Sequence, residues 1–99
     1  MLDKNVIKPL LEKQQYDEIL NILTQEYRDI LQNFFKKHNI AYTEKDTMLD
    51  LILKLKTYFP EYKGFASLLS TALFAEDMDV SDRIATLLDG YENILNQLT

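Results

Sequence analysis

Few side chains in this chain of 99 residues could carry out chemistry, and their spacing completes no catalytic motif. There is one histidine, His38, and no cysteine, which excludes a cysteine nucleophile, a thiolate metal site and a disulfide. We expect His38 to lie in the last turn of a helix, where a positive imidazole complements the helix dipole. The glycines, Gly64 and Gly90, are too far apart to form a phosphate-binding loop. The sequence therefore predicts no catalytic residue and no bound cofactor.

The acidic segment 76–82 is the one candidate for a metal site. Asp77 and Asp79 alternate with other residues as ligands do at the start of a calcium-binding loop. That loop needs a glycine where Asp82 stands and a bidentate glutamate where Leu88 stands, so two demanding positions do not match. Helix capping explains these acidic residues better, and we predict no metal site. An enzyme or enzyme subunit that holds a divalent cation with this segment stays an alternative.

The net charge of −5 is concentrated in the last quarter of the chain. Residues 76–99 contain one basic side chain, Arg83, against six acidic ones. Because an acidic surface repels phosphate groups, binding to nucleic acid is disfavoured. The same charge leaves a second alternative, an acidic decoy of a nucleic-acid-binding protein.

Alternating steps of three and four residues between apolar side chains predict two long amphipathic helices. The two stripes are Leu20, Leu23, Tyr27, Ile30 and Phe34, and Val80, Ile84, Leu87, Tyr91, Ile94 and Leu98. Shorter patterns add further helices, so that the expected segments are 3–14, 16–38, 44–58, 61–75 and from 79 or 81 to 98. With only 2 glycines and 2 prolines for turns, the chain is expected to be all-α, a four- or five-helix up-and-down bundle in a single domain, 1–99.

Local signals refine this expectation. Thr43 is predicted to cap the third helix, with Asp46 at the reciprocal position of a capping box. Gly90 falls inside the last helix, where it costs about 1 kcal/mol relative to alanine. Either a close approach of helices offsets this cost, or the glycine is a chance loss of stability on an exposed face. The expected core is Leu20, Leu23, Tyr27, Ile30, Phe34, Leu51, Leu55, Leu69, Leu73, Ile84, Leu87, Tyr91 and Ile94.

The order of these helices resembles the HEPN superfamily of small helical bundles. Four stretches carry the resemblance: 15–20, 34–40, 49–55 and 83–95. The superfamily includes ribonuclease toxins and the substrate-binding partners of minimal nucleotidyltransferases. The resemblance covers about residues 14–98, and a tetratricopeptide-like helix pair is a competing resemblance for 7–31.

One departure from the HEPN pattern bears on activity. The ribonuclease members carry an arginine and, a few residues later, a histidine near the end of the fourth helix. Residues 69–76 here contain neither, and Arg28 and His38 are too far apart to replace them. The resemblance therefore implies a member without that activity, a binding or regulatory bundle.

The apolar stripes are wider than one chain of this length needs, which favours a protein partner or a homodimer. We expect the interface on the second and fifth helices, at Tyr16, Ile19, Ile22, Tyr27, Leu31, Phe35, Leu88, Tyr91 and Leu95. The least polar stretch, 65–75, is too short to cross a bilayer, so no membrane association is expected. With no cysteine and no signal-like start, a cytoplasmic protein is expected.

Overall fold

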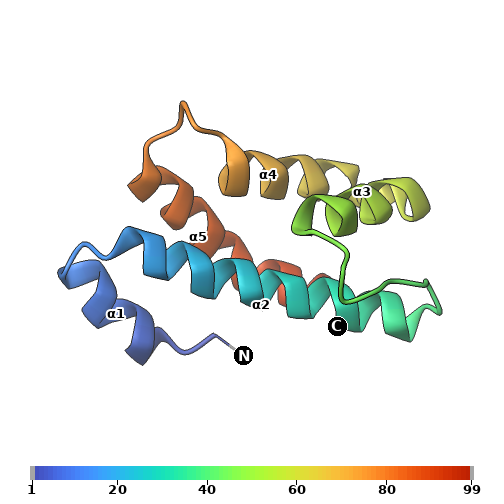
Figure 1. The fold of residues 1–99 in the computed structure, drawn as a ribbon, viewed down its shortest axis with the longest axis horizontal. Helices are drawn as coiled ribbons and strands as arrows, with labels where there is room; N and C mark the ends of the chain where they lie inside the picture. Colours follow the sequence, from blue (N-terminus) through green and yellow to red (C-terminus); the bar gives the residue numbers. More distant parts are fainter. Residues whose placement is uncertain (1, 99) are drawn as a thin grey trace.

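The computed structural model describes residues 2–98, and within them every regular element is a helix (Figure 1). The all-α bundle predicted from the apolar spacing is confirmed. The elements are α1 (Lys4–Glu12), α2 (Tyr16–Lys37), α3 (Met48–Tyr58), a 3-10 turn η1 (Pro60–Tyr62), α4 (Lys63–Phe74) and α5 (Val80–Leu98).

The long helix α2 is the centre of the bundle, and α1, α3 and α5 all pack against it. Direction alternates from α3 to α4 and from α4 to α5, whereas α2 and α5 run side by side in the same direction (Figure 1). Residues 38–47 make this possible, because they carry the chain back along α2 before α3 begins. The α3–α4 hairpin packs on this pair, with α3 against α2 and α4 against α5.

The start of α3 differs from its prediction because the pattern Thr-x-x-Asp occurs twice in succession. Thr47, not Thr43, caps the helix, and its side chain accepts a hydrogen bond from the Asp50 amide while Asp50 accepts one from the Thr47 amide. The predicted pair, Thr43 and Asp46, forms a related contact in a turn just before the helix. The Thr43 amide donates to Asp46 Oδ2 at 3.1 Å, but the Asp46 amide donates to the Thr43 backbone carbonyl and not to its side chain. Both patterns are used, and only the second opens a helix.

One continuous core joins all five α-helices. Every residue of the predicted core is buried except Leu20, which is half-buried and packs against the edge of the core. The prediction omitted several fully buried side chains, namely Ile19, Leu31, Phe35 and Ala66. Three of these lie on α2, because that helix meets neighbours on more than one side.

Candidate binding surfaces

The structure overturns much of the interface expected on α2 and α5. Five of its nine side chains are buried within the chain itself, and these are Ile19, Tyr27, Leu31, Phe35 and Tyr91. The other four, Tyr16, Ile22, Leu88 and Leu95, are half-buried and pack against the core. The wide stripe on α2 is covered by α1, α3 and α5, so that it leaves no exposed apolar face for a partner.

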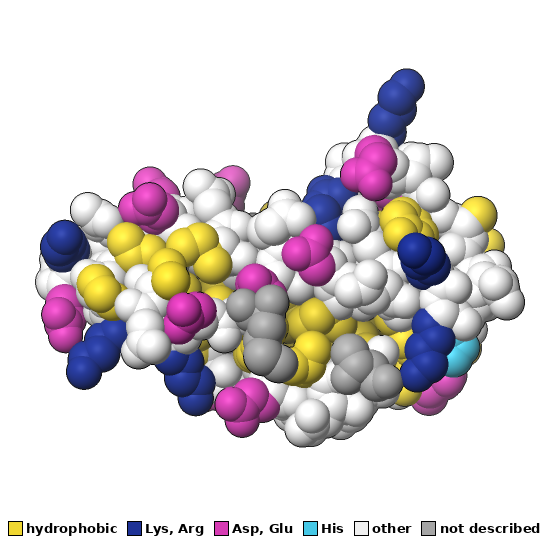
Figure 2. Space-filling view, turned by 90° about the horizontal axis from the view of Figure 1, so that it is seen from below, with side chains coloured by type: hydrophobic (Ala, Val, Ile, Leu, Met, Phe, Trp, Pro, Cys, Tyr) yellow, Lys and Arg dark blue, Asp and Glu magenta, His cyan; other side chains and the backbone are white. Residues whose placement is uncertain are grey.

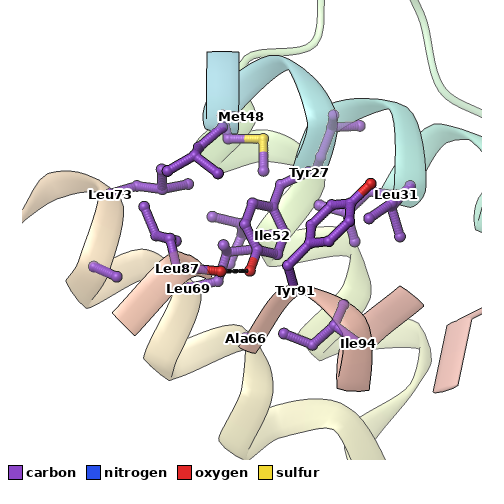
Figure 3. Packing of buried hydrophobic residues seen from close by; sticks show 14 of the residues in the cluster. Tyr27, Leu31, Met48, Ile52, Ala66, Leu69, Leu73, Leu87, Tyr91 and Ile94 are labelled. Atoms are coloured by element: carbon purple, nitrogen blue, oxygen red, sulfur yellow. Dashed lines mark hydrogen bonds between the residues drawn. The ribbon is translucent and has the colours of Figure 1, made fainter. Parts of the chain in front are cut away.

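Tyr27 and Tyr91 have structural roles between α2 and α5 (Figure 3). The Tyr27 hydroxyl donates a hydrogen bond of 2.5 Å to the Leu87 carbonyl, and the two tyrosine rings meet edge to face at 5.9 Å. Burial raises the pKa of Tyr27 well above its ordinary value, so the hydroxyl keeps its proton. These tyrosines therefore fix the spacing of two helices and do not offer reactive groups.

The Tyr91 hydroxyl also ties the start of the chain to α2. It accepts a hydrogen bond from the Leu2 amide at 3.0 Å and donates one to Glu26 Oε2 at 3.1 Å. Burial raises the pKa of Tyr91, and the nearby Glu26 carboxylate acts in the same direction. These two hydrogen bonds hold the segment before α1 against α5, and α5 against α2.

Arg83 is the lone cation of the acidic last quarter, and it closes the end of α4. Its Nε donates to the Ala72 carbonyl at 2.8 Å and its Nη2 donates to the Leu73 carbonyl. These carbonyls lie in the last turn of α4, where intrahelical partners run out. The sequence analysis missed this role, although a single arginine in a long acidic stretch soon after a helix end was a usable signal.

Two further cations hold the returning segment 38–47. Arg28 donates to the Asp46 carbonyl at 2.8 Å, and Lys54 Nζ contacts Asp46 Oδ2 at 2.7 Å and the Ala41 carbonyl at 2.9 Å. The hydrogen bond from Lys54, together with that from the Thr43 amide, lowers the pKa of Asp46. Arg28, Lys54 and Asp46 therefore have structural roles, since they hold the segment 38–47 in place.

The acidic segment 76–82 is likewise used locally. Asp79 accepts hydrogen bonds from the Ser81 amide at 2.8 Å and the Ser81 hydroxyl at 2.6 Å, which caps α5 and lowers the pKa of Asp79. Within residues 2–98, no three histidine, cysteine, aspartate or glutamate side chains lie close enough to hold a metal ion. The structure offers no support for the divalent-cation alternative in this segment.

His38 follows the last residue of α2, close to its expected position at the helix end. Its ring packs on Phe34 and Phe59, with centroid distances of 4.5 and 5.2 Å. The side chain is exposed, and its aromatic contacts explain its place in the fold.

Exposed apolar side chains identify the surfaces that could take a partner. The large ones exposed among residues 2–98 lie on α1, α3 and α4, and none lies on α2 or α5; they are Val6, Leu11, Leu49, Leu53, Tyr58, Leu68 and Phe74. Some of these side chains line two grooves, Leu11 the first and Leu49 and Leu53 the second.

The first groove, the α1–α5 groove, has a volume of about 420 Å³. Its apolar lining comes from both helices, with Ile7 and Leu11 on α1 and Leu88 on α5. Lys4 on one wall faces Glu92 on the other at 3.6 Å, and both side chains are well exposed. Figure 2 shows this side of the molecule, where apolar side chains gather over α1 among acidic and basic ones.

The second groove lies between α3 and α4 and has a volume of about 460 Å³. Leu49 and Leu53 form its α3 side, and small polar side chains, Ser67, Ser70 and Thr71, form its α4 side. Both leucines are more than half exposed, at 51% and 62%.

Comparison of the chain with protein-family models, curated proteins and solved structures found no match. The HEPN resemblance therefore stays a prediction. None of the helices between residues 2 and 98 has the length and apolar content that a membrane span requires.

Proposed function

We propose that the chain is a non-catalytic bundle that binds a protein partner in the α1–α5 groove. One observation carries the proposal: apolar side chains from two helices line an open groove whose walls carry opposite charges. Such a groove suits an amphipathic helix, because an apolar anchor can fill its floor while polar side chains meet the walls.

The ion pair across the α1–α5 groove is weak, so it does not oppose the entry of a partner. The contact between Lys4 and Glu92 joins two exposed side chains, and a pair of that kind contributes about 0–1 kcal/mol. Leu11, which lines the groove, stays 38% exposed. A partner that covers Leu11 removes this apolar surface from water, at about 25 cal/mol per Å².

The partner can be found and then tested with purified components. A photoreactive amino acid in place of Leu11 would cross-link a protein seated in the groove, which mass spectrometry identifies. Calorimetry with the purified partner then compares the wild type with Leu11→Asp, for which we expect binding at least ~10-fold weaker. Leu68→Asp is the matched control, because Leu68 is also an exposed leucine, at 48%, and lies outside the α1–α5 groove. Equal affinity for wild type and Leu11→Asp, or no cross-linked protein, would refute the proposal.

The non-catalytic part of the proposal has its own assay. No buried side-chain nitrogen or oxygen in residues 2–98 lacks a hydrogen bond, so none is left over to act on a substrate. We therefore expect no cleavage of single-stranded RNA, with or without magnesium. Cleavage by the wild type that disappears in His38→Ala would contradict this.

A further inference from the structure

The α3–α4 face combines an exposed apolar row with a row of small side chains. Leu49, Leu53 and Lys56 on α3 and Ser67, Ser70 and Thr71 on α4 line its groove, and Lys63 stands at the start of α4. Leu53 is the most exposed large apolar residue described in the chain, at 62%. The small side chains across the groove allow another helix to approach closely. The leucines come from a helix whose other side is buried in the core, so the core fixes the position of this face.

The acidic and basic side chains near this face stand at equal sequence distances on either side of Leu53 and Ser70. Leu53 and Ser70 both line the groove, one on its α3 side and one on its α4 side. On α3, the acidic Asp50 and the basic Lys56 each stand three residues from Leu53, on opposite sides of it. The charged residues of α4 and the turn after it repeat this arrangement.

On α4 and the residues after it, Lys63 and Asp77 each stand seven residues from Ser70, again on opposite sides. Since α3 and α4 run in opposite directions, Lys56 and Lys63 lie at one end of the face, and Asp50 and Asp77 lie at the other. All four side chains are exposed. Glu61, in the turn before α4, is the acidic exception at the basic end.

We propose that a second copy of this chain docks on the α3–α4 face in an antiparallel, two-fold arrangement. Rotation about an axis across the two helices brings Lys63 of one copy opposite Asp77 of the second, and Lys56 opposite Asp50. A parallel arrangement would place like charges opposite each other, which is unfavourable. The same patch serves both copies, as a closed two-fold interface requires.

This arrangement leaves the α1–α5 groove free. Figure 1 shows α3 and α4 along one side of the molecule and α1 along the other, beyond α2. A dimer built on α3 and α4 therefore carries two outward grooves, and it is independent of the partner binding proposed above.

The test begins with mass in solution. Sedimentation equilibrium of the wild type between about 1 and about 100 μM should give twice the chain mass of 11.7 kDa. Leu53→Asp should return the single-chain mass over the same range. Leu68→Asp is the matched control, because Leu68 is 48% exposed on α4 but belongs to the α4–α5 side, and it should stay dimeric. Circular dichroism shows that both variants remain folded.

A charge exchange then tests the antiparallel register. Lys63→Asp and Asp77→Lys should each weaken the dimer about tenfold, since each replaces two attractive pairs with two repulsive ones. The double variant should restore wild-type affinity within about threefold. A single-chain mass at every concentration would overturn the proposal, as would a dimer that survives Leu53→Asp. Failure of the double variant to recover would overturn the register.

Discussion

Arg83 should contribute about 2 kcal/mol to the stability of the fold, and Arg83→Met tests this. The substitution keeps the apolar stem and removes both hydrogen bonds to the α4 carbonyls of Ala72 and Leu73. Each bond is worth about 0.5–1.5 kcal/mol net, because water can reach the freed carbonyls at this half-buried site. We therefore expect a loss of about 2 kcal/mol, which for a domain of this size lowers Tm by about 8–16 °C.

Arg83→Lys separates hydrogen bonding from charge. Lysine keeps the positive charge among the acidic residues but lacks the planar fork that reaches two carbonyls. We expect it to recover less than half of the loss, measured as the free energy of unfolding in urea. Salt screens the attraction between exposed charges but does not remove hydrogen bonds. The loss in Arg83→Met should therefore persist at about 0.5 M salt. A loss below about 0.5 kcal/mol in Arg83→Met, or full recovery in Arg83→Lys, would refute the argument.

Three further substitutions test other contacts by urea unfolding. Gly90→Ala should stabilise the chain by about 0.5–1 kcal/mol, because alanine favours the helix and its Cβ would have its nearest neighbour at 3.4 Å, an ordinary contact. Destabilisation would show that the helices need the glycine. Tyr27→Phe should cost about 1 kcal/mol through loss of the hydrogen bond to Leu87, and no change would mean that the bond contributes nothing. Lys54 lowers the pKa of Asp46, so ionised Asp46 stabilises the fold at neutral pH, and this contribution is lost as the pH falls through the lowered pKa. Asp46→Asn should therefore lower stability at neutral pH and reduce its fall in acid, whereas an unchanged acid profile would contradict the assignment.

The helices could be predicted from the sequence because their apolar periodicity is long and regular. The start of α3 could not, since Thr43 and Thr47 carry the same capping pattern and only tertiary contacts decide between them. Lys54 and Arg28 hold the first pattern in a turn, and that information lies 8 to 18 residues away from Asp46.

The interface prediction failed for a related reason. The width of the α2 stripe was interpreted as surface left over for a partner, whereas three helices share it. Periodicity shows which side chains need cover and does not show whether another part of the chain supplies it. The exposed leucines on α3, Leu49 and Leu53, lie off the buried stripe of that helix, so its periodicity assigns them to no surface.

The parallel run of α2 and α5 has a consequence for how the chain folds. Tyr27 and Leu87, which join the two helices, are separated by 60 residues, so their contact closes a long loop. An α3–α4 hairpin formed first brings residues 48 and 74 together and shortens that loop to roughly half its length. The closure entropy then falls by about 0.6 kcal/mol. We therefore expect the α3–α4 hairpin to form before α2 pairs with α5, because this order lowers the entropic cost of closing the loop.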